Sequence, residues 1–184
     1  MNEKNKQDGL VLKIAQAAVM AALVAATTFL VQVPIPATKG YLDFGDIMIF
    51  VSALTFGPFV GGFAGGVGSA ISDTISGYAY FAPFTLIIKG AEGLIAGLIS
   101  NRISGKRNVI AVAFAGAEMV TGYFLAEFFG LSEGWAAASE VPFNILQIAV
   151  GGIIGIPIAV ILIKRLPAAW RNQRSDIKPS VKTI

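Results

Sequence analysis

Lys89 and Glu92 stand three residues apart in an otherwise apolar run, residues 85–97. Residues three apart share one face of a helix. Ionisable groups in an apolar membrane helix are costly, and they tend to face a bundle interior or a water-filled cavity. This pair therefore predicts a polar site inside a bundle of membrane helices. The alternative is a salt bridge that links two helices and contacts no ligand.

Further polar side chains stand in two later apolar runs. Tyr123 and Glu127 are four residues apart, and Asn144 and Gln147 are three apart, so each pair shares a helix face. Glu118 is about half a turn out of phase with Glu127, which favours a partner role inside the bundle. Amides, charges and aromatic rings that converge suit a small polar ring compound. Interhelical hydrogen bonds, or a Glu127 that reaches the outer surface, are the alternatives.

The composition indicates an integral membrane protein. Of the 184 residues, 55% are hydrophobic and 14% are charged, whereas soluble domains carry about 25% charged residues. The chain contains no cysteine and no histidine. Disulfides, thiolate nucleophiles and the commonest metal ligands are thereby excluded. We expect no catalytic residues and no metal site.

Apolar runs separated by polar or proline-containing turns predict an all-α bundle of six transmembrane helices. Their expected ranges are 13–33, 47–56, 59–75, 84–99, 109–129 and 142–166. The second run is too short to cross a membrane unless it is tilted or extended, and Asp46 is suited to cap its start. The chain then divides into an N-terminal segment 1–12, a membrane domain 13–166 and a basic tail 167–184.

The basic residues predict the orientation in the membrane. All 14 Lys and Arg residues except Lys39 and Lys89 fall on the side of the two termini. By the positive-inside rule, both termini lie in the cytoplasm. This asymmetry also accounts for the net charge of +3, so the charge does not indicate a protein that binds nucleic acid.

The first apolar run carries alanines in two series that repeat every four residues. The series are Ala17, Ala21 and Ala25, and Ala18, Ala22 and Ala26. Small residues at this spacing let another helix approach closely. The spacing leaves open whether that helix belongs to this chain or to a separate membrane subunit.

Several motifs carry a resemblance to a known family. They are residues 34–46 (PIPATKGYLDFGD), 56–58 (FGP), 65–73 (GGVGSAISD), 76–78 (SGY), 88–93 (IKGAEG), 122–127 (GYFLAE) and 141–147 (VPFNILQ). Together they resemble the S components of energy-coupling factor (ECF) vitamin transporters. The similarity spans about residues 13–166.

The resemblance implies a six-helix membrane protein that captures a vitamin from outside a bacterial or archaeal cell. It implies docking on a transmembrane T subunit driven by two ATPase subunits, so that ATP is used by the partners and this chain holds no cofactor. The alanine series Ala18, Ala22 and Ala26 would then be the docking surface for the T subunit.

The resemblance also implies that the first loop covers the pocket, with ligand contacts from the later loops and helices. The matched motifs and the loops supply the candidate substrate-binding residues Tyr41, Tyr80, Lys89, Glu92, Tyr123, Glu127, Asn144 and Gln147. The sequence is most similar to members associated with riboflavin, pyridoxine or hydroxymethylpyrimidine. It departs from the family pattern at Asp43, where an asparagine is usual.

Two other function classes compete with this interpretation. A stand-alone proton-coupled carrier would use Glu92 and Glu118 as proton relays, but no internal inverted repeat is evident. An intramembrane enzyme would need a serine or paired carboxylates, and no Gly-x-Ser-x-Gly nucleophile motif is present.

Overall fold

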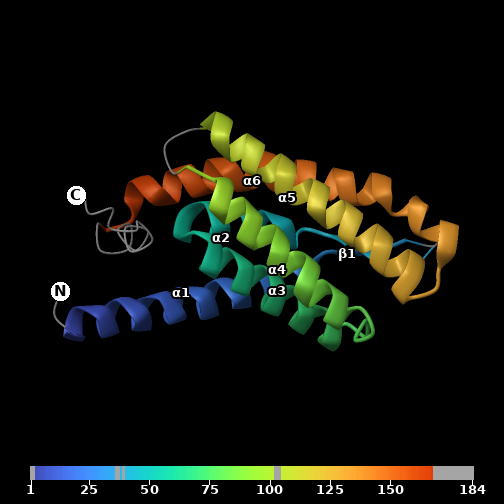
Figure 1. The fold of residues 1–184 in the computed structure, drawn as a ribbon, viewed down its shortest axis with the longest axis horizontal. Helices are drawn as coiled ribbons and strands as arrows, with labels where there is room; N and C mark the ends of the chain where they lie inside the picture. The colour runs from blue at the N-terminus through green and yellow to red at the C-terminus, as the bar shows by residue number, and fades with distance from the viewer. Residues whose placement is uncertain (1–2, 36–37, 39, 102–104, 168–184) are drawn as a thin grey trace, which may run out of the picture.

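The computed structural model describes residues 3–35, 38, 40–101 and 105–167, and it is a bundle of helices (Figure 1). In the described chain the α-helices are α1 (Glu3–Leu30), α2 (Gly45–Phe56), α3 (Pro58–Ile75), α4 (Ala82–Ile99), α5 (Gly105–Leu125) and α6 (Val141–Arg165). A π-helical segment, η1 (Ala126–Gly130), continues α5, and a 3-10 helix, η2 (Gly134–Ser139), precedes α6. The predicted all-α membrane class is confirmed.

Four stretches of the described residues are long and apolar enough to cross a membrane. They are Gln7–Leu30, Ala82–Ile99, Gly105–Gly130 and Gly134–Arg165, and Gly45–Phe56 is a shorter apolar helix. The start of α1 and the end of α6 lie at one end of the bundle, opposite the residues that follow α1 (Figure 1). Six crossings and cytoplasmic termini remain predictions.

The shorter helix α2 lies in the middle of the bundle, with nine of its residues buried. It packs against α1, α3, α4 and α6, while α5 packs against α4 and α6. The tightest crossing joins α3 to α4, where a Cβ on Gly93 would come within 2.2 Å of the Gly61 carbonyl oxygen. The glycines of α3 and α4 therefore let the two backbones touch, and this contact fixes the height of α4 in the bundle.

The first loop contains a short β-hairpin that the sequence did not predict. Strands β1 (Gln32–Pro34) and β2 (Tyr41–Asp43) pair antiparallel, with Val33 opposite Leu42. Because β1 forms at this point, α1 ends at Leu30 rather than at residue 33, and it begins about ten residues earlier than predicted. The predicted cap is also wrong, since Phe44 occupies the N-cap position and Asp46 lies within the first turn of α2.

The two alanine series of α1 face different directions. Ala17 and Ala21 are buried in the bundle, where they join the same core cluster as Val24. Ala18, Ala22 and Ala26 are exposed on the outer side of α1. One series therefore packs within this chain and leaves the other free. Of the predicted basic tail, residues 167–184, all but the first residue lie outside the described part of the chain.

Candidate substrate-binding site

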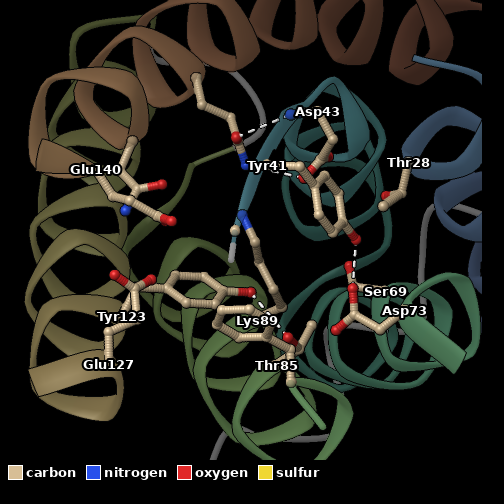
Figure 2. A pocket seen from close by; sticks show the side chains of 14 residues that line it. Thr28, Tyr41, Asp43, Ser69, Asp73, Thr85, Lys89, Tyr123, Glu127 and Glu140 are labelled. Carbon is tan, nitrogen blue, oxygen red and sulfur yellow. Dashed lines mark hydrogen bonds between the residues drawn. The ribbon is translucent and has the colours of Figure 1, made fainter. Parts of the chain in front are cut away.

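A small cavity lies between the hairpin and helices α1, α3, α4, α5 and α6 (Figure 2). Its volume is about 30 Å³, because polar and aromatic side chains fill most of the space. Its lining residues are Thr28, Gly40, Tyr41, Asp43, Ser69, Asp73, Phe81, Thr85, Lys89, Tyr123, Glu127, Glu140, Asn144 and Gln147. Residues from six separate segments thus meet at one point.

Lys89 is buried at the floor of this cavity. Its ammonium pairs with the Asp46 carboxylate of α2, and it lies 3.3 Å from Glu92 Oε2. The same nitrogen lies 5.7 Å from the centre of the Tyr123 ring. The pairing explains why Asp46 does not cap its helix, because its carboxylate neutralises a buried cation instead. Lys89 therefore joins the helices and also contributes to the cavity wall.

Asp43 ties the hairpin to α6. Its backbone N–H donates to Gln147 Oε1 at 3.2 Å, and Gln147 Nε2 donates to Asp43 Oδ2 at 3.3 Å. The Gly45 N–H donates to Asp43 Oδ1 at 2.6 Å. Burial raises the pKa of Asp43 to about 7, although the Lys89 ammonium acts in the opposite direction. The hairpin is thus held over the cavity by a reciprocal pair of hydrogen bonds.

Tyr41 closes another side of the cavity. Its hydroxyl donates to the Asp73 carboxylate of α3, and its ring lies 4.7 Å from that of Tyr78. Burial and the Asp73 and Asp43 carboxylates raise the pKa of Tyr41, so the phenol stays protonated and remains a donor. On the other side of the cavity (Figure 2), the Tyr123 hydroxyl donates to Thr85 Oγ1 at 3.1 Å. Two aromatic rings therefore flank the site.

Glu127 and Glu140 bring two further carboxyl groups to the cavity on the side of Tyr123 (Figure 2). The first loop packs directly on Glu140, which accepts a hydrogen bond from the Thr38 hydroxyl. A Cβ on Gly40 would come within 2.0 Å of Glu140 Oε1, so a larger residue here would require the Glu140 side chain to move. Glu127 is fully buried, its side chain lies within hydrogen-bonding reach of Glu140, and neither of its carboxyl oxygens accepts from an N–H or hydroxyl group of the described residues.

The structure brings together most of the predicted site residues. Six of them line the cavity: Tyr41, Lys89, Tyr123, Glu127, Asn144 and Gln147. Glu92 lies behind Lys89 and is not a lining residue, and Tyr80 is 42% exposed outside the cavity. Whether any of the eight contacts substrate remains a prediction.

Sequence reasoning missed the contributions of α1 and α3. Thr28, Ser69 and Asp73 were not among the candidate substrate-binding residues, yet all three line the cavity. Burial of Ser69 follows from the glycine-rich character of α3, which makes it a helix in close contact with its neighbours. That character was the available signal, but it does not tell which neighbour the helix meets.

A helical bundle that combines membrane-spanning segments with an enclosed polar cavity defines a membrane protein that binds a small polar molecule. Residues 10–164 match the sequence model of the ECF-type riboflavin transporter S component family. This chain belongs to that family, and the predicted resemblance to S components is confirmed. It is therefore a transporter component of the vitamin-binding class and not an enzyme.

Two relatives are similar over most of their length. An uncharacterised protein of Pyrococcus woesei is 48% identical over 144 residues, which is 78% of this chain and 96% of the relative. The thiamine precursor transporter HmpT of Lactococcus lactis subsp. cremoris is 30% identical over 156 residues, 84% of this chain and 86% of the relative.

Proposed function

We propose that this protein captures a small heteroaromatic vitamin or vitamin precursor from outside a bacterial or archaeal cell. The compound belongs to the pyridoxine, hydroxymethylpyrimidine or riboflavin class. The observation that carries the proposal is the cavity itself, in which Tyr41 and Tyr123 offer ring faces and the surrounding carboxyl, amide and hydroxyl groups offer edges. Membership of the S component family and the similarity to a thiamine precursor transporter support the same substrate range.

The hairpin gives the site its cover. Gly40, Tyr41 and Asp43 line the cavity, and the hairpin is attached to α6 by the Asp43–Gln147 pair and to Glu140 by Thr38. These are hydrogen bonds between side chains and a short loop, which can separate without unfolding any helix. Separation of the hairpin from α6 would admit a ring compound to a cavity that is otherwise only about 30 Å³.

The exposed series Ala18, Ala22 and Ala26 of α1 is the surface that docks on the transmembrane T subunit. These alanines present a smooth stripe, whereas Ala17 and Ala21 are already used inside the bundle. ATP is hydrolysed by two ATPase subunits that join the T subunit, and this chain supplies the substrate specificity.

A proton-coupled carrier that works alone is less well supported. Glu92, its first proposed relay, lies beside the Lys89 ammonium at 3.3 Å and does not line the cavity. A carboxyl group that neutralises a buried cation is poorly placed to exchange protons with water.

Uptake by reconstituted vesicles tests the proposal. The protein is placed in proteoliposomes with or without T and ATPase subunits, and the uptake of labelled hydroxymethylpyrimidine, pyridoxine or riboflavin is measured. We expect uptake only when the partner subunits are present and ATP is supplied on the side of the membrane where the ATPase subunits lie. Collapsing the proton gradient should have no effect on this uptake. Uptake without partners that follows the proton gradient would support the carrier instead.

A further inference from the structure

Glu127 is a buried carboxyl group for which the described chain provides no N–H or hydroxyl donor, although the Glu140 carboxyl lies within hydrogen-bonding reach of it. The exposed fraction of Glu127 is 0%, and both Oε1 and Oε2 lack such a donor. A buried polar group without a partner is costly, so each such group in a native structure calls for an explanation. Because Glu127 also lines the cavity, a bound compound is in position to supply the missing donors.

The other acidic residues of the cavity differ from Glu127 in having donors within the chain. Asp43 accepts from the Gly45 N–H and from Gln147, Asp73 accepts from Tyr41, and Glu140 accepts from Thr38. Glu127 is therefore the carboxyl group of the described cavity to which no N–H or hydroxyl group of the described chain donates, and its polar neighbour is the Glu140 carboxyl. Two oxygens of one carboxyl group lie side by side and suit two parallel hydrogen bonds.

A local change of helix geometry positions Glu127. The π-helical segment η1 follows α5 directly, and its wider turn is marked by the Leu131 N–H, which donates to the Ala126 carbonyl at 2.9 Å. The Glu127 carbonyl accepts from the Glu133 N–H at 3.0 Å, which fixes the backbone at this residue. Single π-helical turns inside α-helices occur frequently at functional sites.

The opposite part of the cavity carries a second set of unused polar atoms. Thr28 Oγ1, Ser69 Oγ and Asp73 Oδ2 are buried without partners among the described residues. Figure 2 places these three side chains together, across the cavity from Glu127. A compound that satisfies both sets carries hydrogen-bonding groups at two separate edges of its ring.

The chemistry of a carboxyl group determines which ring edge fits Glu127. A ring nitrogen next to a carbon that bears an amino group presents two nitrogen atoms in parallel. If the ring nitrogen is protonated, the carboxylate accepts two N–H bonds. If the ring is neutral, the protonated carboxyl donates to the ring nitrogen and accepts from the amino group. Either arrangement contains one shared proton.

We propose that Glu127 selects an amino-substituted nitrogen heterocycle, such as an aminopyrimidine, by pairing both carboxyl oxygens with its ring-nitrogen and amino-group edge. The hydroxyl groups of Thr28 and Ser69, with Asp73, then bind a polar substituent on the other side of the ring. This inference rests on the proposed function and narrows its substrate range. Rings without a ring nitrogen next to an amino-bearing carbon are therefore not expected to bind tightly.

The test compares two compounds on the full-length wild-type protein and its variants in detergent. The compounds are hydroxymethylpyrimidine, which carries the ring amine, and its analogue in which a methyl group replaces that amine. Isothermal titration calorimetry measures both on wild-type protein, E127M and E127Q. We expect E127M to bind the amine compound about 100-fold more weakly, since two hydrogen bonds of a charged or acidic group are lost. Binding of the methyl analogue, already weak on wild-type protein, should change less than tenfold.

The glutamine variant is expected to rescue binding. Its amide can donate to the ring nitrogen and accept from the amino group, as glutamine does with adenine, so affinity should return to within about tenfold of wild type. E118M is the matched control, because Glu118 lies on the same helix α5 but does not line the cavity. It should bind both compounds as wild type does.

Four outcomes would overturn the inference. If wild-type protein bound both compounds equally, the ring amine would not contribute to binding. This comparison does not depend on the folding of any variant. E127M that weakens both compounds by the same factor would show a structural role for Glu127. Tight binding of pyridoxine or riboflavin by wild-type protein would overturn this inference alone, whereas binding of no heteroaromatic compound would overturn the proposed function as well.

Discussion

Replacing Lys89 by methionine should destabilise the bundle more than any change to an exposed lysine. Lys89 is 2% exposed and its ammonium is shared by the carboxylates of Asp46 and Glu92, each of which is 0% exposed. Removal of one partner from a buried ion pair costs about 3–5 kcal/mol, because an uncompensated charge remains. We therefore expect K89M to lower the free energy of unfolding by about that amount.

A charge-free version of the same cluster separates this electrostatic cost from lost packing. The triple variant D46N/K89M/E92Q keeps similar side-chain volumes and removes all three charges, so it should recover most of the lost stability. Lys106, which is exposed at the start of α5, provides the matched control K106M, with an expected change below about 0.5 kcal/mol. Unfolding by SDS in mixed micelles, followed by circular dichroism, measures all three variants.

Two results would refute this reasoning. K89M within about 1 kcal/mol of wild type would mean that Asp46 and Glu92 do not depend on the ammonium. A triple variant as unstable as K89M would mean that packing, and not charge, sets the cost. The triple variant also tests the role of Lys89 in the site, since restored stability with weakened vitamin binding would assign Lys89 a contact with substrate.

Three further predictions follow from other parts of the structure. Ala18→Phe should prevent the T subunit from co-purifying while vitamin affinity is unchanged. The control Ala117→Phe, at an exposed position of α5, should change neither property. Loss of vitamin binding in Ala18→Phe would indicate misfolding or a different docking face. The pKa of Asp43 is raised from 3.8 to about 7, so its contribution to stability is full below pH 3.8 and is lost as pH rises toward 7. Asp43→Asn should therefore make the melting temperature less dependent on pH across this interval. An unchanged dependence of melting temperature on pH would contradict the assignment. Gly93→Ala should lower the free energy of unfolding by more than about 2 kcal/mol, since its Cβ would meet a backbone carbonyl at 2.2 Å. The control Gly90→Ala, whose Cβ would have its nearest neighbour at 3.6 Å, should lower it by less than about 1 kcal/mol. Equal effects of the two substitutions in an unfolding titration would contradict the packing of α3 on α4.

Composition and periodicity were sufficient to predict the class of the fold. Long apolar runs interrupted by proline and glycine are a strong signal in a membrane protein, because each span must satisfy its own backbone. The lysine at position 89 could be recognised as part of a special site for the same reason, since a charge in an apolar run needs a partner. These signals are local, and the sequence displays them directly.

The partners of those residues could not be predicted, because they depend on how the helices pack. Asp46 has the position of a helix cap in the sequence, but its carboxylate is drawn to the Lys89 ammonium of a neighbouring helix. Ser69 and Asp73 reach the cavity because α3 packs against both α1 and α4. Nothing in the local pattern of α3 records which helices it contacts.

The hairpin and the π-helical segment were missed for a different reason. Each strand has only three residues and one includes Pro34, so neither shows the alternation that predicts a strand. The π-helical turn at Ala126–Gly130 changes the phase at the end of α5 without any proline in that helix. Both features adjust the backbone around the cavity, and sequence patterns are least informative for such short departures from regular structure.

Native mass spectrometry of the purified protein tests the central claim most directly. The chain is expressed in a host grown with hydroxymethylpyrimidine, pyridoxine and riboflavin, purified in detergent, and released intact into the spectrometer. The account predicts one small heteroaromatic compound bound per chain, which disappears when the cavity is altered by Asn144→Leu together with Gln147→Leu. A protein that carries no such compound, and binds none when the three are added back, would contradict it.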